Sequence, residues 1–238
     1  MRALSAAYGV FLAVGIFLLV VTLALHWVTF DLDFYESKYE WLAVPESLQV
    51  DMPTLMGYTT ALLDYLSGER DTPNVEARVR GRVGPLYGER ELLHLVDVRE
   101  LYVLSWRIRN WAFIGVLSLA FAAYRTAGLR RVLGAYAATT AAVVVALLGL
   151  TALAVLDFER YFTWFHLISF DNDLWLLDPA TEHLINMFPE AFFAAATLRI
   201  GITAIVAFAL LGFVAWQVSK KATLWEREVA LSGEASDK

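Results

Sequence analysis

The sequence contains no cysteine in 238 residues, which excludes disulfide bonds, thiolate metal sites, iron–sulfur clusters and a cysteine nucleophile. Charged residues are also scarce, at 18%, whereas hydrophobic residues reach 58%. Soluble domains average about 25% and about 45–50% for these two classes. A soluble fold of this length cannot bury so many apolar side chains, so we expect lipid to cover part of the chain. The net charge of −6, without a strongly basic face, argues against a nucleic-acid partner.

Four long apolar runs predict an all-α integral membrane protein that forms a single membrane domain over residues 1–238. Because a span needs about 20 residues, we place four transmembrane helices at about 3–30, 107–128, 132–156 and 197–218. The second run is the shortest, and it has arginines at one end. The first run exceeds the apolar core of a signal peptide, about 7–15 residues, and no clear cleavage site follows it. We therefore expect it to be a retained helix.

The basic residues predict the orientation, since Lys and Arg in short loops mark the cytoplasmic side. They lie before the first span, between the second and third, and after the fourth: Arg2, Arg125, Arg130, Arg131, Lys220, Lys221 and Arg227. Both termini are then cytoplasmic, and the two long loops, 31–106 and 157–196, are extracytoplasmic. In the first loop, the apolar spacing of 56–66 and 89–106 predicts amphipathic helices. The strict alternation of 75–83 predicts a strand, as in one half of a short β-hairpin.

Two of the four histidines have sequence surroundings that suit acid–base chemistry. Asp97 follows His94 by one helical turn, where a carboxylate can orient an imidazole, and His166 lies just after the third span. Both histidines are predicted on the outer side, near the membrane surface. The sequence alone favours a catalytic role and a structural role about equally for each of them. We interpret His26 as a packing residue and His183 as a solvated one. The chain has no GxSxG serine motif and no HExxH metal motif.

The second loop carries the most specific pattern in the chain. It reads FH at 165–166, ND-x-W at 172–175 and LI-x-x-FPE-x-FF at 184–193, and H-x-x-DV stands upstream at 94–98. This set resembles the lipoprotein intramolecular transacylases, a small family of four-span bacterial membrane proteins. The match is strong over 162–193 and moderate over 89–102; elsewhere only the hydropathy agrees.

The resemblance implies an enzyme of the bacterial cytoplasmic membrane whose active site faces outward. Such enzymes move the sn-2 acyl chain of a diacylglyceryl lipoprotein onto the α-amino group of its N-terminal cysteine, which gives the lyso form without a cofactor. Histidine, with a pKa of about 6.5, is a suitable base for an α-amino group of pKa about 7.7–8.0.

We accordingly expect the catalytic pair to be His94 and His166, with the assignment of the base left open. The expected supporting residues are Asp97, Asp171, Asn172 and Asp173. The expected substrate-binding residues are Arg99, Arg107, Arg109, Trp164 and Trp175. Besides the lipoprotein, the expected partners are membrane lipids, and no metal is expected.

Two alternatives remain open at the level of sequence. The first is a metal-dependent membrane hydrolase that uses both histidines and nearby carboxylates, such as Asp171, Asp173 and Glu190. The second is a non-enzymatic scaffold or receptor whose outer loops bind a partner.

Overall fold

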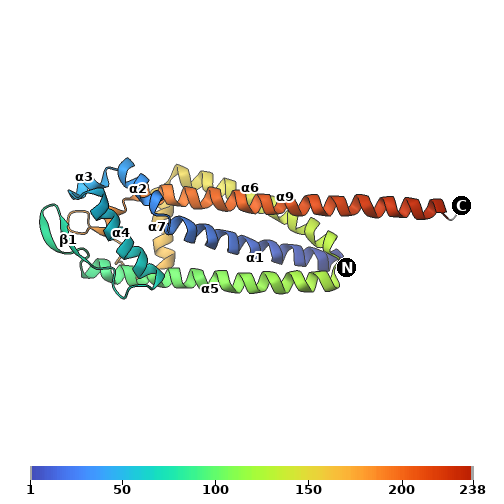
Figure 1. Cartoon of the computed structure of the whole chain (residues 1–238), viewed down its shortest axis with the longest axis horizontal. Helices are drawn as coiled ribbons and strands as arrows, with labels where there is room; N and C mark the ends of the chain where they lie inside the picture. Colours follow the sequence, from blue (N-terminus) through green and yellow to red (C-terminus); the bar gives the residue numbers. More distant parts are fainter. Residues whose placement is uncertain (1, 237–238) are drawn as a thin grey trace. The chain divides into compact units, whose positions relative to one another are not determined.

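The computed structural model describes residues 2–236, without the side chains of 154, 155 and 222–236. The side chain of Arg227, expected on the cytoplasmic side, therefore lies outside the described residues. The chain is mostly helical (Figure 1) and divides into two compact units. Unit 1 comprises Met1–Ala24, Ile108–Ala152 and Gly201–Lys238; unit 2 comprises Leu25–Arg107 and Leu153–Ile200.

Unit 1 is built from parts of four long helices. These are α1 (Arg2–Thr29), α5 (Glu89–Thr126), α6 (Leu129–Leu156) and α9 (Glu190–Ser236). Gly128, with φ of 74°, separates α5 from α6. The helices α1 and α6 approach closely at Gly9, where an added Cβ would lie 2.5 Å from Ala135 Cβ, so a larger residue there would push them apart.

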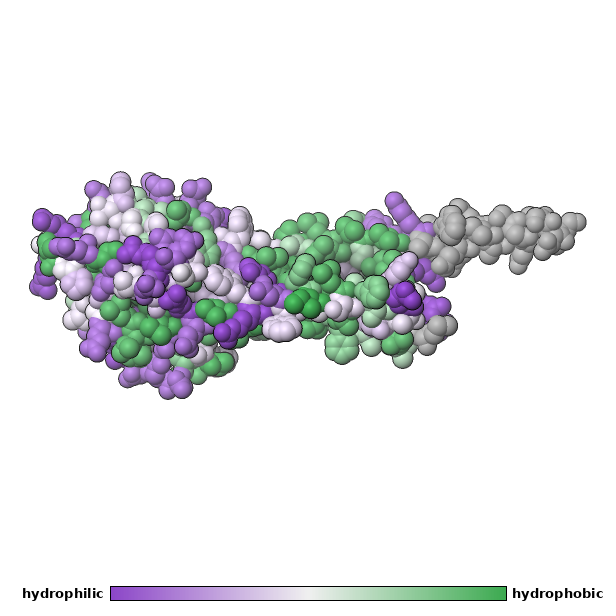
Figure 2. All heavy atoms as spheres, turned by 60° about the horizontal axis from the view of Figure 1, so that its bottom comes forward, coloured by the Kyte–Doolittle hydropathy of each residue, from purple (hydrophilic) through white to green (hydrophobic). Residues whose placement is uncertain are grey.

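Three helices among the described residues are long and apolar enough to cross a membrane: Arg2–Thr29, Leu129–Leu153 and Glu190–Lys221. They coincide with three of the four expected spans, although the third begins earlier than the predicted 197. The expected span 107–128 overlaps the last part of α5, which ends at Thr126, and is not among them, because its apolar run is short and is flanked by Arg107, Arg109 and Arg125. Figure 2 shows hydrophobic side chains over much of the visible surface of the long helices.

Unit 2 contains the shorter elements together with the ends of the long helices. These elements are α2 (Leu32–Trp41), α3 (Val44–Leu48), α4 (Met52–Ser67), β1 (Glu76–Val79), β2 (Arg82–Pro85), α7 (Phe158–Ser169) and α8 (Leu184–Met187). The helix expected at 56–66 is α4, which Asp51 caps by accepting a hydrogen bond from the Thr54 N–H at 2.8 Å. Gly68, at φ 91°, ends it.

The segment 75–83 forms a strand, a turn and the start of a second strand, so the prediction of one continuous strand is wrong. The strands β1 and β2 pair antiparallel, with Val79 opposite Arg82. Arg80 and Gly81 between them have φ of 50° and 76°, the left-handed pair that a two-residue hairpin turn needs. Opposed residues share one face of the hairpin, so Val79 and Arg82 lie on the same side and the alternation of the sequence does not continue across the turn.

The core of unit 2 is aromatic. Tyr35 and Tyr39 of α2 pack against Phe188 and Phe192, with ring centroids 5.2–6.1 Å apart. Phe188 and Phe192 belong to the LI-x-x-FPE-x-FF motif, and both are buried. This part of the motif therefore holds the second long loop against the first.

Candidate active site

The helices α5 and α7 bring His94 and His166 together inside unit 2. Their ring centroids lie 6.3 Å apart, with 31° between the ring planes. Each side chain is only 7% exposed. The Phe170 ring touches both, at 5.3 Å from His94 and 5.7 Å from His166. Two imidazoles from distant parts of the sequence thus share one largely apolar environment.

The hydrogen bond of His166 within α7 sets the tautomer of its neutral ring. The Nδ1 atom lies 2.7 Å from the Phe162 carbonyl oxygen, one helical turn earlier. Because a carbonyl only accepts hydrogen bonds, the ring proton belongs on Nδ1, and Nε2 carries the lone pair. Trp175 covers the ring, with centroids 4.8 Å apart and 30° between the planes. Burial lowers the pKa of His166, and the hydrogen bond to Phe162 partly opposes this.

His94 is held neutral near physiological pH. Burial lowers its pKa to about 4, the neighbouring His166 and Arg90 add to the decrease, and the Asp97 charge opposes it. Its Nδ1 atom is buried and has no hydrogen-bond partner among the described residues. A buried polar atom without a partner costs about 1–3 kcal/mol, so its retention here points to a functional use.

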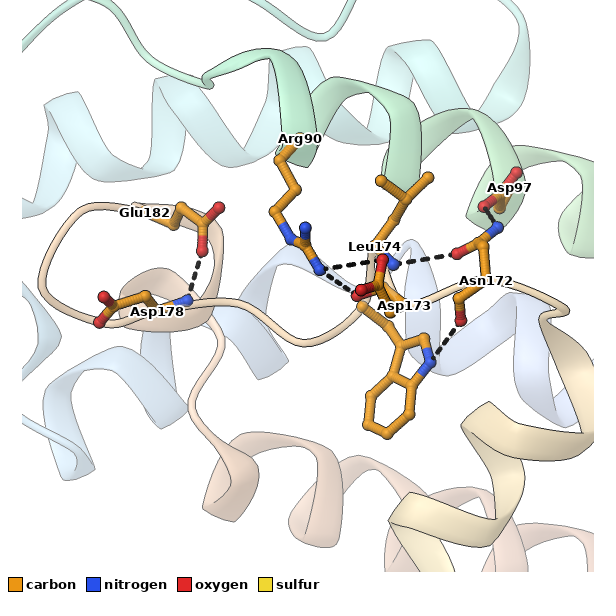
Figure 3. Close-up of polar contacts among 8 residues, drawn as sticks. Arg90, Asp97, Asn172, Asp173, Leu174, Asp178 and Glu182 are labelled. Atoms are coloured by element: carbon orange, nitrogen blue, oxygen red, sulfur yellow. Dashed lines mark hydrogen bonds and ion pairs between the residues drawn. The ribbon is translucent and has the colours of Figure 1, made fainter.

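The ND-x-W motif ties the second loop to α5 through bonds to Asp97 and Arg90 (Figure 3). The Asn172 side-chain amide donates to Asp97 Oδ2 at 2.9 Å, and its Oδ1 accepts from the Leu174 N–H at 3.0 Å. The Trp175 indole N–H donates to the Asn172 carbonyl at 3.0 Å, which orients the ring that covers His166. Arg90 pairs with the Asp173 carboxylate at 3.3 Å and also donates to the Asp173 carbonyl. The motif is therefore a local network that positions Trp175.

Glu91 is a structural residue of the site that the sequence patterns did not single out. Its side chain is 1% exposed, and its two oxygens accept from the backbone N–H groups of Gly88, at 2.7 Å, and Leu184, at 2.6 Å. The first bond is half of a capping box at the start of α5, and the second anchors the second loop. The sequence offered one signal for this role, because Glu91 stands three residues after Gly88, the spacing of a capping box at the start of a helix.

The remaining predicted residues lie in other surroundings. The Arg99 guanidinium stacks on the Tyr65 ring at 4.6 Å, and Trp164 lies under the Arg160 guanidinium at 4.7 Å. Asp171 and Arg107 are exposed. Arg109 belongs to unit 1 and bonds to the neighbouring Asn110 side chain. Of the eleven predicted site residues, the structure thus gathers six into contact with the pair or its network: His94, Asp97, His166, Asn172, Asp173 and Trp175.

Within the described part of the chain, no three His, Asp or Glu side chains are arranged to hold a metal ion. The metal-dependent hydrolase hypothesis therefore has no donor set there. The third buried histidine of unit 2, His26, has its Nε2 atom 2.8 Å from the Ser105 hydroxyl oxygen and its ring against Trp106. It serves packing, in the role expected from sequence.

The comparisons with known proteins agree on one family. The sequence model of the lipoprotein intramolecular transacylase Lit matches residues 10–193. Among solved structures, the membrane integral lipoprotein intramolecular transacylase Lit from Bacillus cereus is similar, with a TM-score of 0.77 and 19% identity over 94% of this chain and 100% of that one. A variant of the Bacillus cereus protein with one histidine replaced by arginine has a TM-score of 0.72 and 18% identity, over 93% of this chain and 94% of that one. No curated protein matches by sequence.

Proposed function

The chain belongs to the lipoprotein intramolecular transacylase family, and from this we propose that it moves the sn-2 acyl chain of a diacylglyceryl lipoprotein onto the α-amino group of the N-terminal cysteine. The substrate carries both the donor ester and the acceptor amine. The enzyme must therefore orient the two groups and move protons between them. Orientation of this kind can contribute about 7–11 kcal/mol, so no covalent acyl-enzyme is required.

The proton balance of the reaction fits a histidine pair. The amine nitrogen attacks the ester carbonyl, so a C–N bond forms while the C–O bond to glycerol breaks. One proton leaves the nitrogen and one reaches the glycerol oxygen. A single imidazole that accepts the first proton and then returns it to the leaving oxygen closes this cycle.

His166 is the better candidate for the proton carrier. Its hydrogen bond to the Phe162 carbonyl leaves the Nε2 lone pair directed away from the helix backbone. The same bond stabilises the imidazolium, because the charged ring donates more strongly to a carbonyl. His94, neutral by burial, supplies the second imidazole, whose unpartnered Nδ1 would hydrogen-bond the reacting groups. The proximity of these two rings is the observation that carries the proposal.

We also propose that residues 107–128, which include the last part of α5, form a fourth span. This stretch exposes Trp111, Phe113, Ile114, Leu117 and Phe121 by 52–72% each, a surface that suits lipid and not water. With four spans, the distribution of Lys and Arg places both termini in the cytoplasm and the histidine pair outside. The substrate then meets the site at the outer leaflet of the bacterial membrane.

The test is mass spectrometry of the N-terminal peptide of a diacylglyceryl lipoprotein incubated with the reconstituted protein. The expected product has one acyl chain on the α-amino nitrogen and one on glycerol, with no change in total mass. The same peptide without protein is the control. A free fatty acid and a lighter lipopeptide would instead identify a hydrolase, and an unmodified peptide would contradict the proposal.

A further inference from the structure

The helix α7 carries an uncovered apolar surface on the side away from the histidine pair. The exposed large side chains in this short helix are Trp164, Phe165, Leu167 and Ile168, at 46%, 52%, 62% and 86%. His166 is the buried residue of the same helix. With about 3.6 residues per turn, Trp164 and Ile168 share one face, and His166 falls on the opposite face. The helix thus presents its site residue to the protein and its apolar side chains outward.

The residues at the edge of this apolar face are those that favour a membrane interface. Tyr161 packs edge-to-face on Trp164, with centroids 5.5 Å apart, and the Arg160 guanidinium lies 4.7 Å from the Trp164 ring. Tyr and Trp concentrate at the headgroup level of bilayers, and Arg reaches lipid phosphates from there while its stem stays in apolar surroundings. A helix with one broad apolar face and such an edge typically lies in the plane of the interface.

The chain itself connects this face to a membrane-spanning helix. A single residue, Asp157, separates α6 from α7, and its carboxylate accepts a hydrogen bond from the Arg160 N–H at 3.4 Å to start the new helix. Leu156, the last residue of α6, is 80% exposed. The apolar stretch of α6, Leu129–Leu153, thus ends four residues before α7 begins at Phe158. The polar residues between the apolar surface of α6 and the apolar face of α7 are Asp157, Glu159 and Arg160.

We propose that α7 lies in the outer interface of the bilayer with Trp164, Phe165, Leu167 and Ile168 among the lipid acyl chains, and thereby fixes the depth of His166. The occupant of this apolar face is lipid. If the proposed transacylation is correct, this depth serves the chemistry, because the ester bonds of a diacylglyceryl group lie just below the headgroups. The helix would then hold the imidazole level with the bond to be broken.

The absence of cysteine makes the depth directly measurable, since one introduced thiol is the only label site. The variant Ile168→Cys carries a nitroxide in the full-length protein reconstituted into phosphatidylglycerol–phosphatidylethanolamine vesicles. Leu148→Cys in the span of α6 is the lipid reference, and Ala180→Cys in the exposed loop before α8 is the water reference. Collision with oxygen, which partitions into lipid, is compared with collision with a water-soluble nickel chelate.

The label at Ile168 is expected to resemble that at Leu148, with high oxygen and low nickel accessibility. A nickel accessibility equal to that at Ala180 would overturn the proposal. This result is independent of catalysis: a lipid-exposed label in a protein without transacylase activity would leave the position of α7 intact and remove only the proposed reaction.

A second variant tests the consequence for the site. Ile168→Asp places a charge in the acyl region and is expected to lower the transacylation rate on bilayer-embedded lipoprotein several-fold, whereas Ile168→Leu preserves the rate. An unchanged rate in Ile168→Asp, in protein that retains its secondary structure, would show that the depth of α7 does not set the position of His166.

Discussion

Two buried histidine environments of unit 2, around His26 and around the His94–His166 pair, differ in which ring nitrogen is hydrogen-bonded. The Ser105 hydroxyl donates to the Tyr102 carbonyl at 2.7 Å, so its oxygen accepts from His26 Nε2 at 2.8 Å. His26 therefore carries its proton on Nε2, within a closed chain of bonds. His166 carries its proton on Nδ1 and keeps the Nε2 lone pair, and His94 has a buried Nδ1 without a partner. These imidazoles are therefore alike in burial and differ in their hydrogen bonds.

The largest effects are expected when each imidazole is removed in turn. His166→Ala and His94→Ala are each expected to lower transacylation by about 10²–10⁴-fold, the usual contribution of a positioned acid–base group. His26→Ala should instead lower the free energy of unfolding by about 1–3 kcal/mol, because the Ser105 oxygen loses its donor, while folded protein keeps its rate. Rates come from mass spectrometry of the lipopeptide and stability from denaturant unfolding in micelles. Loss of rate in His26→Ala equal to that in His166→Ala would erase the distinction.

Glu91 caps the helix that carries His94 and anchors the second loop, so its removal tests how that side of unit 2 is held. Glu91→Ala leaves the buried N–H group of Leu184 without an acceptor, at about 1–3 kcal/mol, and removes the capping contact of the exposed Gly88, at about 1 kcal/mol, so we expect a loss of about 3 kcal/mol in unfolding free energy. Glu91→Gln keeps one carbonyl acceptor and should lose about half as much. Thermal unfolding followed by circular dichroism measures both. Equal stability of the two variants would show that the carboxylate oxygens do not anchor the second loop.

Acid should destabilise the protein, because the folded state lowers the pKa of His94. In the unfolded chain this pKa is about 6.5, and in the folded protein it is about 4, so only the unfolded chain takes up the proton between these values. Stability is fully present above about pH 6.5 and falls as the pH decreases towards 4, by up to about 3 kcal/mol at about 1.4 kcal/mol per unit. The lowered pKa of His166 adds a change of the same sign.

The control for this pH effect is His94→Gln, which has no group to titrate there. Its unfolding free energy should decrease less between pH 6.5 and 4 than that of the original protein. Parallel pH profiles for the two proteins would mean that His94 is not the source of the acid sensitivity.

The smallest expected effect concerns the network that positions Trp175. Asn172→Ala removes the bond to Asp97 and is expected to lower the rate about fivefold, since one partly exposed hydrogen bond contributes about 1 kcal/mol. Asn172→Asp should be more harmful, because it sets a second carboxylate against Asp97. The measurement is the same lipopeptide assay, with tryptophan fluorescence as a readout of the Trp175 environment. A rate for Asn172→Asp above that of Asn172→Ala would exclude the bond to Asp97 as its role.

The sequence predicts those features that depend on periodicity. Three apolar runs locate helices suited to cross a membrane, and the apolar spacing of 56–66 locates α4. The hairpin turn was not predictable from alternation, because Arg80 adopts a left-handed conformation that only its partner Gly81 and the pairing of β1 with β2 make favourable. The amphipathic character of α7 was not identified from the sequence, because Phe158 and Phe162 add aromatic residues outside its exposed apolar face.

The candidate site, like the fold, was only partly predictable from the sequence. His94 and His166 were identifiable as candidates from residue type and neighbouring motifs, yet their proximity depends on the aromatic core that joins the two long loops. The network around Asn172 and the role of Glu91 depend on backbone N–H groups, which carry no residue-specific signal in a sequence. The placement of arginines such as Arg99, which stacks on Tyr65, depends on packing between distant elements.

The bond from His166 to the Phe162 carbonyl joins two residues of the same helical turn. The helical spacing of α7 therefore sets the orientation of the ring through this bond, which needs no partner from elsewhere in the chain. Insertion or deletion of one residue between 162 and 166 would rotate this imidazole away while leaving the composition of the motif intact. Spacing within this turn, more than the identity of its neighbours, is what a designer who transplants the site would have to copy.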